Sequence, residues 1–298
     1  MKFPRFRTLI PKPLRSYTDR LYLKHCERTA GRRPLPDFII IGAQKSGTTS
    51  LFDYLLQHPD IKGSFCKEVH FFTKNYERGE SWYRARFPVK KTGTRKFLYG
   101  EATPYYICHP HVPKRIHQLV PDIKLIAVLR NPTDRAISHY FHVYRKKREP
   151  LPLMEALQQE EQRLQKIWSR ILADESYANR DHQWYSYKQR GLYAEQLQRY
   201  FDLFERHQIL IVDSADLFKH TAETIRQIHA FLGVAPQPVS NHFKARNVGT
   251  KKGDIAPEVY SYLDEYFAPH NRALSELTGR SFSWGKPLPE TDNKGKSC

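Results

Sequence analysis

Residues 42–49 have residue types and spacing that suit phosphate binding. They read Gly-Ala-Gln-Lys-Ser-Gly-Thr-Thr and directly follow a run of apolar residues. Backbone N–H groups in such a loop, and the first turn of a helix after it, can bind a dianionic phosphate. A Walker A loop, G-x-x-x-x-G-K-[ST], places its lysine after the second glycine. Here Gly42 and Gly47 keep the glycine spacing, but Thr48 follows Gly47 and the lysine lies inside the loop as Lys45. The loop therefore predicts a phosphate site that lacks the lysine position of a nucleoside triphosphate site.

A second group of phosphate-binding residue types follows the apolar segment 123–129. Arg130 lies where that predicted strand ends, and Ser138 comes about two helical turns later. A guanidinium can hold a phosphate with two hydrogen bonds, and a serine hydroxyl can add another. A surface arginine paired with Asp134 is the alternative interpretation. We favour phosphate binding, because two strand ends would then present such groups to one edge of the sheet.

Alternating strands and helices must position these two groups. Apolar runs predict strands at residues 38–41, 97–99, 123–129 and 209–212. Helices are expected from Thr48 to His58 and over residues 134–147, 153–172, 192–205, 221–232 and 257–278. Strands separated by helices favour right-handed crossovers and parallel pairing. The predicted fold class is therefore α/β: a single P-loop-like domain with a central, mainly parallel sheet flanked by helices.

The composition is that of a basic, folded protein. The 298 residues include 49 lysines and arginines against 31 acidic residues, a net charge of +18, and 40% are hydrophobic. Such an excess favours a polyanionic partner: nucleic acid, anionic lipid, a sulfated or uronic-acid glycan, or a multiply phosphorylated cofactor. Residues 1–36 are expected to form a basic N-terminal extension, and residues 287–298 a flexible tail. The extension either is solvated and packs loosely on the domain, or is attracted to an anionic membrane or polymer.

Three motifs, read in order along the chain, resemble one family. They are the loop at 42–49, Lys67-Glu68-Val69-His70-Phe71-Phe72, and the Leu-Arg-Asn-Pro-x-x-Arg-x-x-Ser pattern at 129–138. Together they resemble the sulfotransferases that use 3′-phosphoadenosine 5′-phosphosulfate (PAPS), and most closely the carbohydrate branch that includes the heparan sulfate enzymes. The resemblance extends from Asp37 to Trp284 and takes in Arg190-Gly191-Leu192-Tyr193 and Thr250-Lys251-Lys252-Gly253. It implies a sulfotransferase domain over residues 37–286, with PAPS as donor, 3′-phosphoadenosine 5′-phosphate (PAP) as product and no metal.

The resemblance assigns most of the motif residues to the donor. The loop would wrap the 5′-phosphosulfate, and Arg130 with Ser138 would hold the 3′-phosphate. Lys45 would stabilise the negative charge that develops on the oxygen between sulfur and the departing phosphate. Whether Lys251 or Lys252 contacts the 3′-phosphate stays open. The expected donor-binding residues are Gln44, Lys45, Ser46, Gly47, Thr48, Thr49, Arg130, Ser138, Tyr193, Lys251, Lys252 and Gly253.

Glu68 is the candidate general base, because the matching glutamate of heparan-type enzymes takes the acceptor proton. A salt bridge to Lys67 or to an arginine of residues 84–86 is the alternative. His70 is the second candidate: it would act as the base, orient the sugar, or pack beside the phenylalanine pair. The 3-O-sulfating branch has an acid where this chain has Thr73 and a lysine where it has Ala102. Both departures concern the acceptor and leave the donor site unchanged.

These observations predict an enzyme that moves a sulfuryl group from PAPS to a carbohydrate hydroxyl by in-line displacement. The acceptor is expected to be a glycan, with an anionic glycan among the candidates, and no specific nucleic acid partner is expected. A lipid or another small alcohol is the alternative acceptor. A P-loop kinase or NTPase is a rival, because the strand at 209–213 ends in Asp213 like a Walker B segment. A nucleic-acid-binding protein that acts through its basic surface is a further rival.

Cysteine usage and hydropathy bear on the cellular location. The four cysteines at 26, 66, 108 and 298 form no C-x-x-C pair and no cluster at metal-ligand spacing, so we expect free thiols in a reducing compartment. No signal-peptide core and no apolar run of about 18 residues is visible. A cytoplasmic protein is expected, or a Golgi lumenal one if an anchor has been removed.

Overall fold

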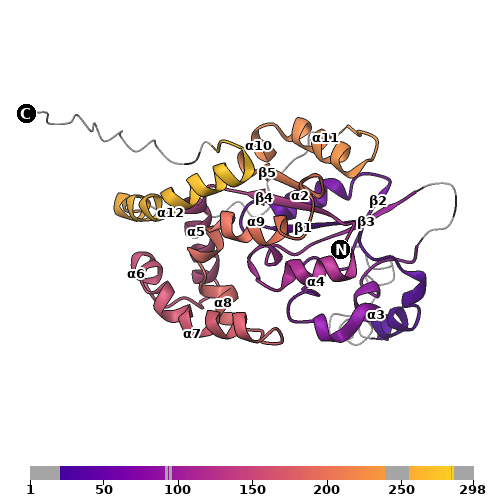
Figure 1. Ribbon diagram of the computed structural model, residues 1–298, viewed down its shortest axis with the longest axis horizontal. Helices are drawn as coiled ribbons and strands as arrows, with labels where there is room; N and C mark the ends of the chain where they lie inside the picture. The colour runs from indigo at the N-terminus through magenta and orange to yellow at the C-terminus, as the bar shows by residue number, and fades with distance from the viewer. Residues whose placement is uncertain (1–20, 91–92, 94–95, 239–254, 283, 285–298) are drawn as a thin grey trace, which may run out of the picture.

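Five parallel strands form the centre of the protein. The computed structural model describes residues 21–90, 93, 96–238, 255–282 and 284. Within them the strands pair in the order β2-β3-β1-β4-β5, and every pairing is parallel (Figure 1). The strands are β1 (Phe38–Gly42), β2 (Ile61–Gly63), β3 (Leu98–Ala102), β4 (Lys124–Leu129) and β5 (Ile209–Asp213). The predicted α/β class with a parallel central sheet is confirmed.

Helices connect these strands. They are α2 (Thr48–Leu55), α3 (Gly79–Arg84), α4 (Val112–Leu119), α5 (Pro132–Tyr144), α6 (Leu153–Gln158), α7 (Glu160–Ala173), α8 (Arg180–Tyr185), α9 (Tyr193–Phe201), α10 (Ser214–Lys219), α11 (Thr221–Leu232) and α12 (Pro257–Thr278). The predicted helices at 221–232 and 257–278 have the observed bounds. The predicted helix at 153–172 is instead two helices, α6 and α7, which meet at Gln159.

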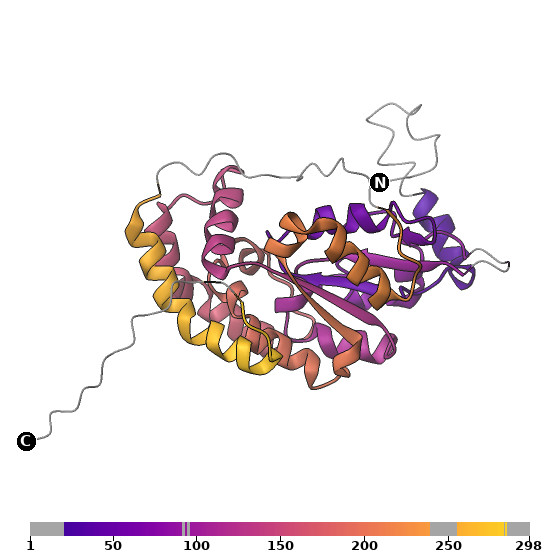
Figure 2. The same cartoon turned by 90° about the horizontal axis from the view of Figure 1, so that it is seen from above.

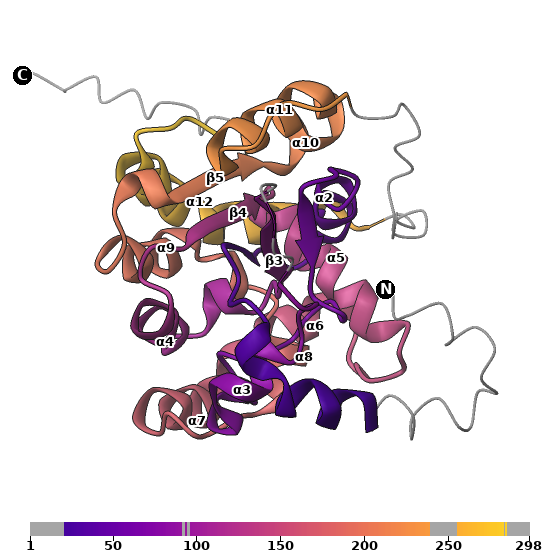
Figure 3. The same ribbon diagram turned by 90° about the vertical axis from the view of Figure 1, so that its right-hand side faces the viewer.

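The two faces of the sheet carry separate cores, because successive strand residues point to opposite sides. Ile39 and Ile41 of β1 pack in a cluster that includes residues of α4 and α9. Phe38 and Ile40 pack in a second cluster with residues of α2 and α11. Figure 1 shows α11 and α4 on opposite sides of the sheet, and Figure 3 shows the same layers from the side.

A third core lies beside the sheet and joins α5, α6 and α12. Ile137 and Tyr140 of α5 pack in it with Leu157 of α6 and Leu263 and Phe267 of α12. Figure 2 shows α5 and α12 grouped together to one side of the strands. This packing fixes the direction of α5, the helix that carries Ser138.

Residues 21–36, which the sequence analysis places in a basic extension, pack onto the domain. Residues 21–28 are helical, and Cys26 is fully buried. The buried Arg33 side chain donates to the main-chain carbonyl of Phe87. The Lys90 N–H donates to the carbonyl of Arg32 at 2.8 Å. This part of the predicted extension is therefore packed on the domain, whereas residues 1–20 and 287–298 lie outside the described residues.

Two further observations concern membrane and redox chemistry. None of the helices in the described part of the chain is both long and apolar enough to cross a membrane. Cys26, Cys66 and Cys108 are free thiols, and Cys298 lies outside the described residues.

Candidate functional site

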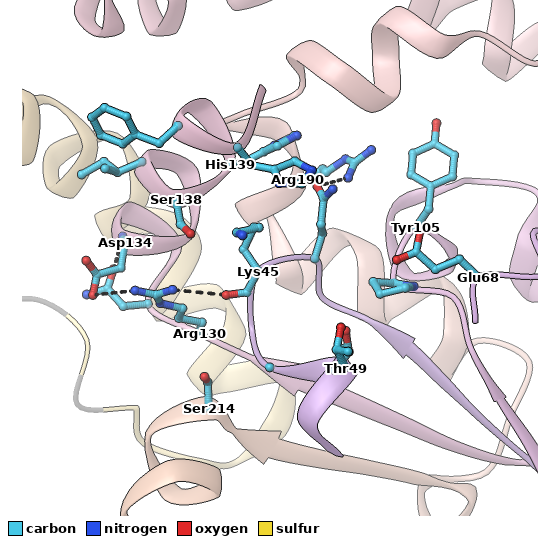
Figure 4. Close-up of a pocket in the computed structure, with 18 of the residues that line it drawn as sticks. Lys45, Thr49, Glu68, Tyr105, Arg130, Asp134, Ser138, His139, Arg190 and Ser214 are labelled. Carbon is cyan, nitrogen blue, oxygen red and sulfur yellow. Dashed lines mark hydrogen bonds and ion pairs between the residues drawn. The ribbon is translucent and has the colours of Figure 1, made fainter. Parts of the chain in front are cut away.

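A pocket of about 1170 Å³ lies where the strands of the sheet end at their carboxyl side. Its lining joins the loop after β1, the first turns of α5 and the segment before β3 that carries Glu68 (Figure 4). The predicted site residues that line it are Gln44, Lys45, Gly47, Thr48, Thr49, Glu68, His70, Arg130 and Ser138. The fold thus brings the two predicted phosphate-binding groups and the predicted base to one cavity.

The loop after β1 has the shape that its two glycines predict. Gly47 has a φ of 96°, in the left-handed region that glycine adopts without strain. A Cβ at this position would lie 2.8 Å from the ring of Phe218, so the close approach also requires glycine. Helix α2 begins at Thr48, and its N-cap residue, Gly47, has no side chain that could cap the first turn. Its first N–H groups therefore remain available to an anionic ligand in the pocket.

Arg130 lies at the end of β4 and binds the neighbouring loop. Its Nη1 donates to the main-chain carbonyl of Lys45 at 3.2 Å, and its Nη2 lies 3.8 Å from the carboxylate of Asp134. The pair with Asp134 considered above is therefore present, although Arg130 also lines the pocket. The Asn131 side chain caps α5 by accepting the N–H of Thr133 at 2.9 Å, which sets the helix direction.

Two of the predicted donor residues lie beneath the pocket rather than in its lining. The buried Tyr193 hydroxyl donates to the carbonyl of Arg130 at 3.0 Å, so it supports the arginine from behind. Ser46 is fully buried in the loop. Lys251, Lys252 and Gly253 lie outside the described residues. The part that these five residues play in donor binding stays a prediction.

Burial and neighbouring cations lower the pKa of Lys45 to about 8. Burial of the ammonium group is the largest cause, and the charges of Arg145 and Arg130 add to it. An ammonium group in this environment gains from a bound anion, because the anion offsets both the lost hydration and the repulsion between cations. The electrostatics of the loop therefore suit a negatively charged ligand beside Lys45.

Glu68 and His70 lie on a strained turn at the edge of the pocket. Both have left-handed backbone conformations, with φ of 60° and 54°. The Glu68 N–H donates to the carbonyl of Ala102 at 3.0 Å, which ties the turn to β3. The His70 Nε2 lies 3.5 Å from one Glu68 oxygen, and the Lys67 Nζ lies 3.8 Å from the other.

The environment of Glu68 lowers its pKa. Burial is the largest single influence and raises the pKa, but the hydrogen bond from His70 and the charges of Lys67, His70 and Arg190 together outweigh it. The carboxylate is thus ionised at neutral pH and able to accept a proton. The salt bridge to Lys67 that was the alternative interpretation is present as well, and it is one of the causes of this ionisation.

The pocket lining also contains residues outside the predicted set of site residues. Lys67 contacts the Thr49 hydroxyl as well as Glu68, so it connects the donor loop to the predicted base. Its position beside Glu68 in the sequence was the available signal. Arg190, Tyr105 and Trp184 also line the pocket. Arg190 belongs to a motif quoted above, whereas nothing in the sequence singled out Tyr105.

The Walker-like acid Asp213 takes part in local structure. Its side chain caps α10 by accepting the N–H of Ala215 at 2.7 Å, and its second oxygen accepts the indole N–H of Trp284 at 3.1 Å. Over the residues that the structure describes, no group of three or more histidine, cysteine or acidic side chains is placed to hold a metal ion.

Comparisons with known proteins agree with this geometry. Residues 35–258 match the family described as the sulfotransferase domain. The human heparan sulfate glucosamine 3-O-sulfotransferase 6 is 31% identical over 279 residues, which cover 86% of this chain and 75% of that protein. The human bifunctional heparan sulfate N-deacetylase/N-sulfotransferase 2 is 31% identical over 298 residues, which cover 88% of this chain but only 31% of that protein.

Solved structures give the same result. A sulfotransferase from Alicyclobacillus acidocaldarius matches with a TM-score of 0.65 and 31% identity, covering 84% of this chain and 98% of that chain. A mouse sulfotransferase complexed with PAP shares the fold, with a TM-score of 0.51 and 16% identity over 86% of this chain and 90% of that chain. With its phosphate-binding loop, parallel sheet and family match, the chain belongs to the sulfotransferase domain family.

Proposed function

We propose that this protein transfers a sulfuryl group from PAPS to a hydroxyl group of a carbohydrate. The observation that supports this most directly is that a phosphate-binding loop and an ionised carboxylate line the same pocket. The relatives named for heparan sulfate sulfation support a glycan as the acceptor.

The donor half of the reaction uses the loop and the arginine after β4. The N-terminus of α2 and the loop N–H groups would bind the 5′-phosphate of PAPS, and Arg130 with Ser138 the 3′-phosphate. Lys45 would lie beside the oxygen that joins sulfur to that 5′-phosphate. Because negative charge grows on this oxygen as its bond to sulfur breaks, the ammonium group binds the transition state more tightly than the ground state.

The acceptor half uses Glu68. The acceptor hydroxyl oxygen forms a bond to sulfur as the bond from sulfur to the 5′-phosphate oxygen breaks, and the hydroxyl proton passes to the Glu68 carboxylate. The products are a sulfate ester, PAP and protonated Glu68, which later returns its proton to water. His70 and Lys67 keep Glu68 ionised before the reaction by lowering its pKa.

The acceptor side of the pocket suits a sugar. Trp184 offers an aromatic surface at the pocket wall, and the cations of Lys146 and Arg148 lie 5.1 Å and 4.1 Å from its ring centre. A sugar stacks on such a ring, and acidic substituents on the sugar would meet these cations.

The cellular location stays a prediction, and the comparisons do not support the expectation of a cytoplasmic protein.

A transfer assay tests this function. The protein is incubated with PAPS and a panel of acceptors: heparan sulfate, its desulfated form, chondroitin and a simple aliphatic alcohol. We expect mass spectrometry to show an added sulfuryl group on a saccharide, PAP to be released in equal amount, and Lys45→Met to lose the activity. Transfer only to the aliphatic alcohol, or phosphate transfer from ATP in place of sulfuryl transfer, would contradict the proposal.

A further inference from the structure

Arg190 is a buried cation that the mechanism above does not use. Its side chain is only 4% exposed, yet it lines the pocket. Three neutral groups hold the guanidinium in place. Nε donates to the Ser186 hydroxyl at 2.9 Å, Nη2 donates to the Gln183 carbonyl at 3.0 Å, and Nη1 contacts the side-chain oxygen of Gln44. Its charged centre also lies 4.7 Å from the centre of the Tyr105 ring.

The backbone around Arg190 leaves it little freedom. The carboxylate of Glu160 accepts the N–H groups of Lys188 and Gln189, which fixes the short turn that carries the arginine. Gly191 packs so closely that a Cβ there would lie 2.6 Å from the ring of Phe267. Arg190 is therefore preorganised at a fixed point of the pocket wall.

In the described part of the chain, the direct contacts of the Arg190 guanidinium are with neutral groups. Among the residues that the structure describes, no acidic side chain lies within ion-pair distance of Arg190; its charge acts on Glu68 across the pocket, where it is one of the causes that lower the pKa of that carboxyl. Burying an unpaired charge is costly, and an anion bound beside Arg190 would offset that cost. The pocket that Arg190 lines is the place where such a ligand can reach it.

The position of Arg190 indicates which part of the pocket the anion occupies. Gln44, its contact, precedes Lys45 in the donor loop, and Tyr105, its aromatic neighbour, lies on the acceptor side. Figure 4 shows Arg190 between Lys45 and Tyr105, on the other side of Lys45 from Arg130. The anion therefore lies at the reacting end of the pocket, away from the arginine assigned to the 3′-phosphate.

We propose that Arg190, held by Gln44, binds an oxyanion at the reacting end of the pocket. This inference rests on the proposed function. The oxyanion comes from one of two sources with the same chemistry: the sulfuryl group of the donor, or an acidic substituent of the acceptor next to the reacting hydroxyl.

Two variants of Arg190 test this site and separate the two sources. Arg190→Met removes the charge, and Arg190→Lys keeps the charge but loses the planar guanidinium and its paired hydrogen bonds. Arg206→Met is the control, because Arg206 is exposed and lies outside the pocket lining. If the site holds the sulfuryl group, Arg190→Met weakens PAPS binding by about 10- to 100-fold and changes PAP binding by less than about twofold. Calorimetry with each nucleotide measures both affinities.

If the site holds an acidic group of the acceptor, the kinetics differ. PAPS affinity then stays unchanged, the KM for an acidic saccharide rises by about 10-fold or more, and the KM for its neutral counterpart does not. Either result supports the proposal. Equal losses of PAP and PAPS affinity, together with a lower melting temperature, would show a purely structural role and overturn it.

A measurement on the unmodified protein covers the case in which the variants do not fold. The protein saturated with PAP is titrated with inorganic sulfate, because PAP occupies the phosphate sites and leaves the reacting end open. Saturable binding of sulfate is expected, and its absence overturns the inference. If the unmodified protein transfers no sulfuryl group, the proposed function is wrong. If it does transfer the group, and Arg190→Met leaves the PAPS affinity and the acceptor KM unchanged, only this inference is wrong.

Discussion

The donor side and the acceptor side of the pocket are built in different ways. On the donor side, the loop after β1 and Arg130 after β4 follow two strands that pair directly, with Ile40 opposite Ile126. On the proposed acceptor side, Glu68 and Tyr105 come from two separate loops, and Arg190, which lies between the two sides, comes from a third short turn. Under the proposed function, donor binding would depend on strand ends that belong to the fold, whereas acceptor binding would depend on side chains that individual loops supply.

The two sides also differ in how neighbours tune their charges. Burial and nearby cations lower the pKa of Lys45 on the donor side, which prepares it for an anion. On the proposed acceptor side, His70 and Lys67 lower the pKa of Glu68, which keeps the carboxylate ionised and able to accept a proton. Variants on the two sides should therefore separate donor affinity from the transfer step.

The largest effect is expected from Glu68→Gln. The amide keeps the shape but accepts no proton, so the transfer rate should fall by about 10²- to 10⁴-fold. PAP affinity should stay within about twofold, because Glu68 lies on the acceptor side. Initial rates and calorimetry measure the two quantities.

Glu80→Gln is the matched control, since Glu80 is an exposed carboxylate in a surface pair with Arg84. His70→Asn decides between the two candidate bases: if His70 were the base, this variant and not Glu68→Gln would abolish transfer. A loss of PAP affinity in Glu68→Gln equal to its loss of rate would remove the distinction between the two sides.

Arg130→Met should weaken PAP binding by about 10- to 100-fold, because one charge-assisted contact to the 3′-phosphate is lost. Adenosine 5′-phosphosulfate, which has no 3′-phosphate, serves as the matched ligand and should bind both proteins equally well. Calorimetry with the two nucleotides measures this. An equal loss for both would show that Arg130 acts through its contact with the Lys45 carbonyl instead.

The pH dependence of PAP binding should report on Lys45, whose pKa is lowered to about 8 in the free protein. The charged form of Lys45 binds the anion. Below pH 8 Lys45 is already charged, so PAP affinity should not change with pH through this group. Above pH 8 the group must regain a proton on binding, and the affinity should fall by up to about tenfold per pH unit. Calorimetry from pH 7 to 9 measures the slope, which Lys45→Met should abolish; the same slope in that variant would assign it to another group.

The smallest effect on catalysis is expected from Glu101→Gln. Glu101 is fully buried, and its carboxylate accepts the hydroxyls of Tyr83 at 2.6 Å and Thr103 at 2.7 Å. Burial raises its pKa to about 7. In the unfolded chain the Glu101 carboxyl has a lower pKa and releases its proton at lower pH. Between the unfolded and the folded pKa, the folded state therefore binds more protons than the unfolded state. This contribution to stability is full below the unfolded pKa and falls as pH rises to about 7.

Urea unfolding at pH 5 and pH 7 tests this stability prediction. Between pH 5 and pH 7 the free energy of unfolding of the unmodified protein should fall by about 1 kcal/mol or more through Glu101, and that of Glu101→Gln should fall by less. PAP affinity should not change. An identical pH dependence in both proteins would show that Glu101 stays ionised in the folded protein.

The sequence predicted the parts of the fold that depend on local pattern. Strand β4 and helices α11 and α12 lie where the apolar spacing places them, since burial on one face leaves a repeating pattern in the chain. The short β2, α3 and α8 were not predicted, because three to six residues are too few to show a period. The break at Gln159 was missed, because the apolar spacing runs on across it.

By itself, the sequence determined the family and predicted that the loop after β1 and the arginine after β4 face one pocket, because these inferences depend on residues that are close together in the chain. Only the tertiary structure decided that Lys67 contacts both Thr49 and Glu68, that the Tyr193 hydroxyl donates to the Arg130 carbonyl, and that Arg190 is a buried cation in the pocket lining. Burial and charge balance depend on groups that are distant in the chain, such as Gln44 beside Arg190, and no local pattern records them.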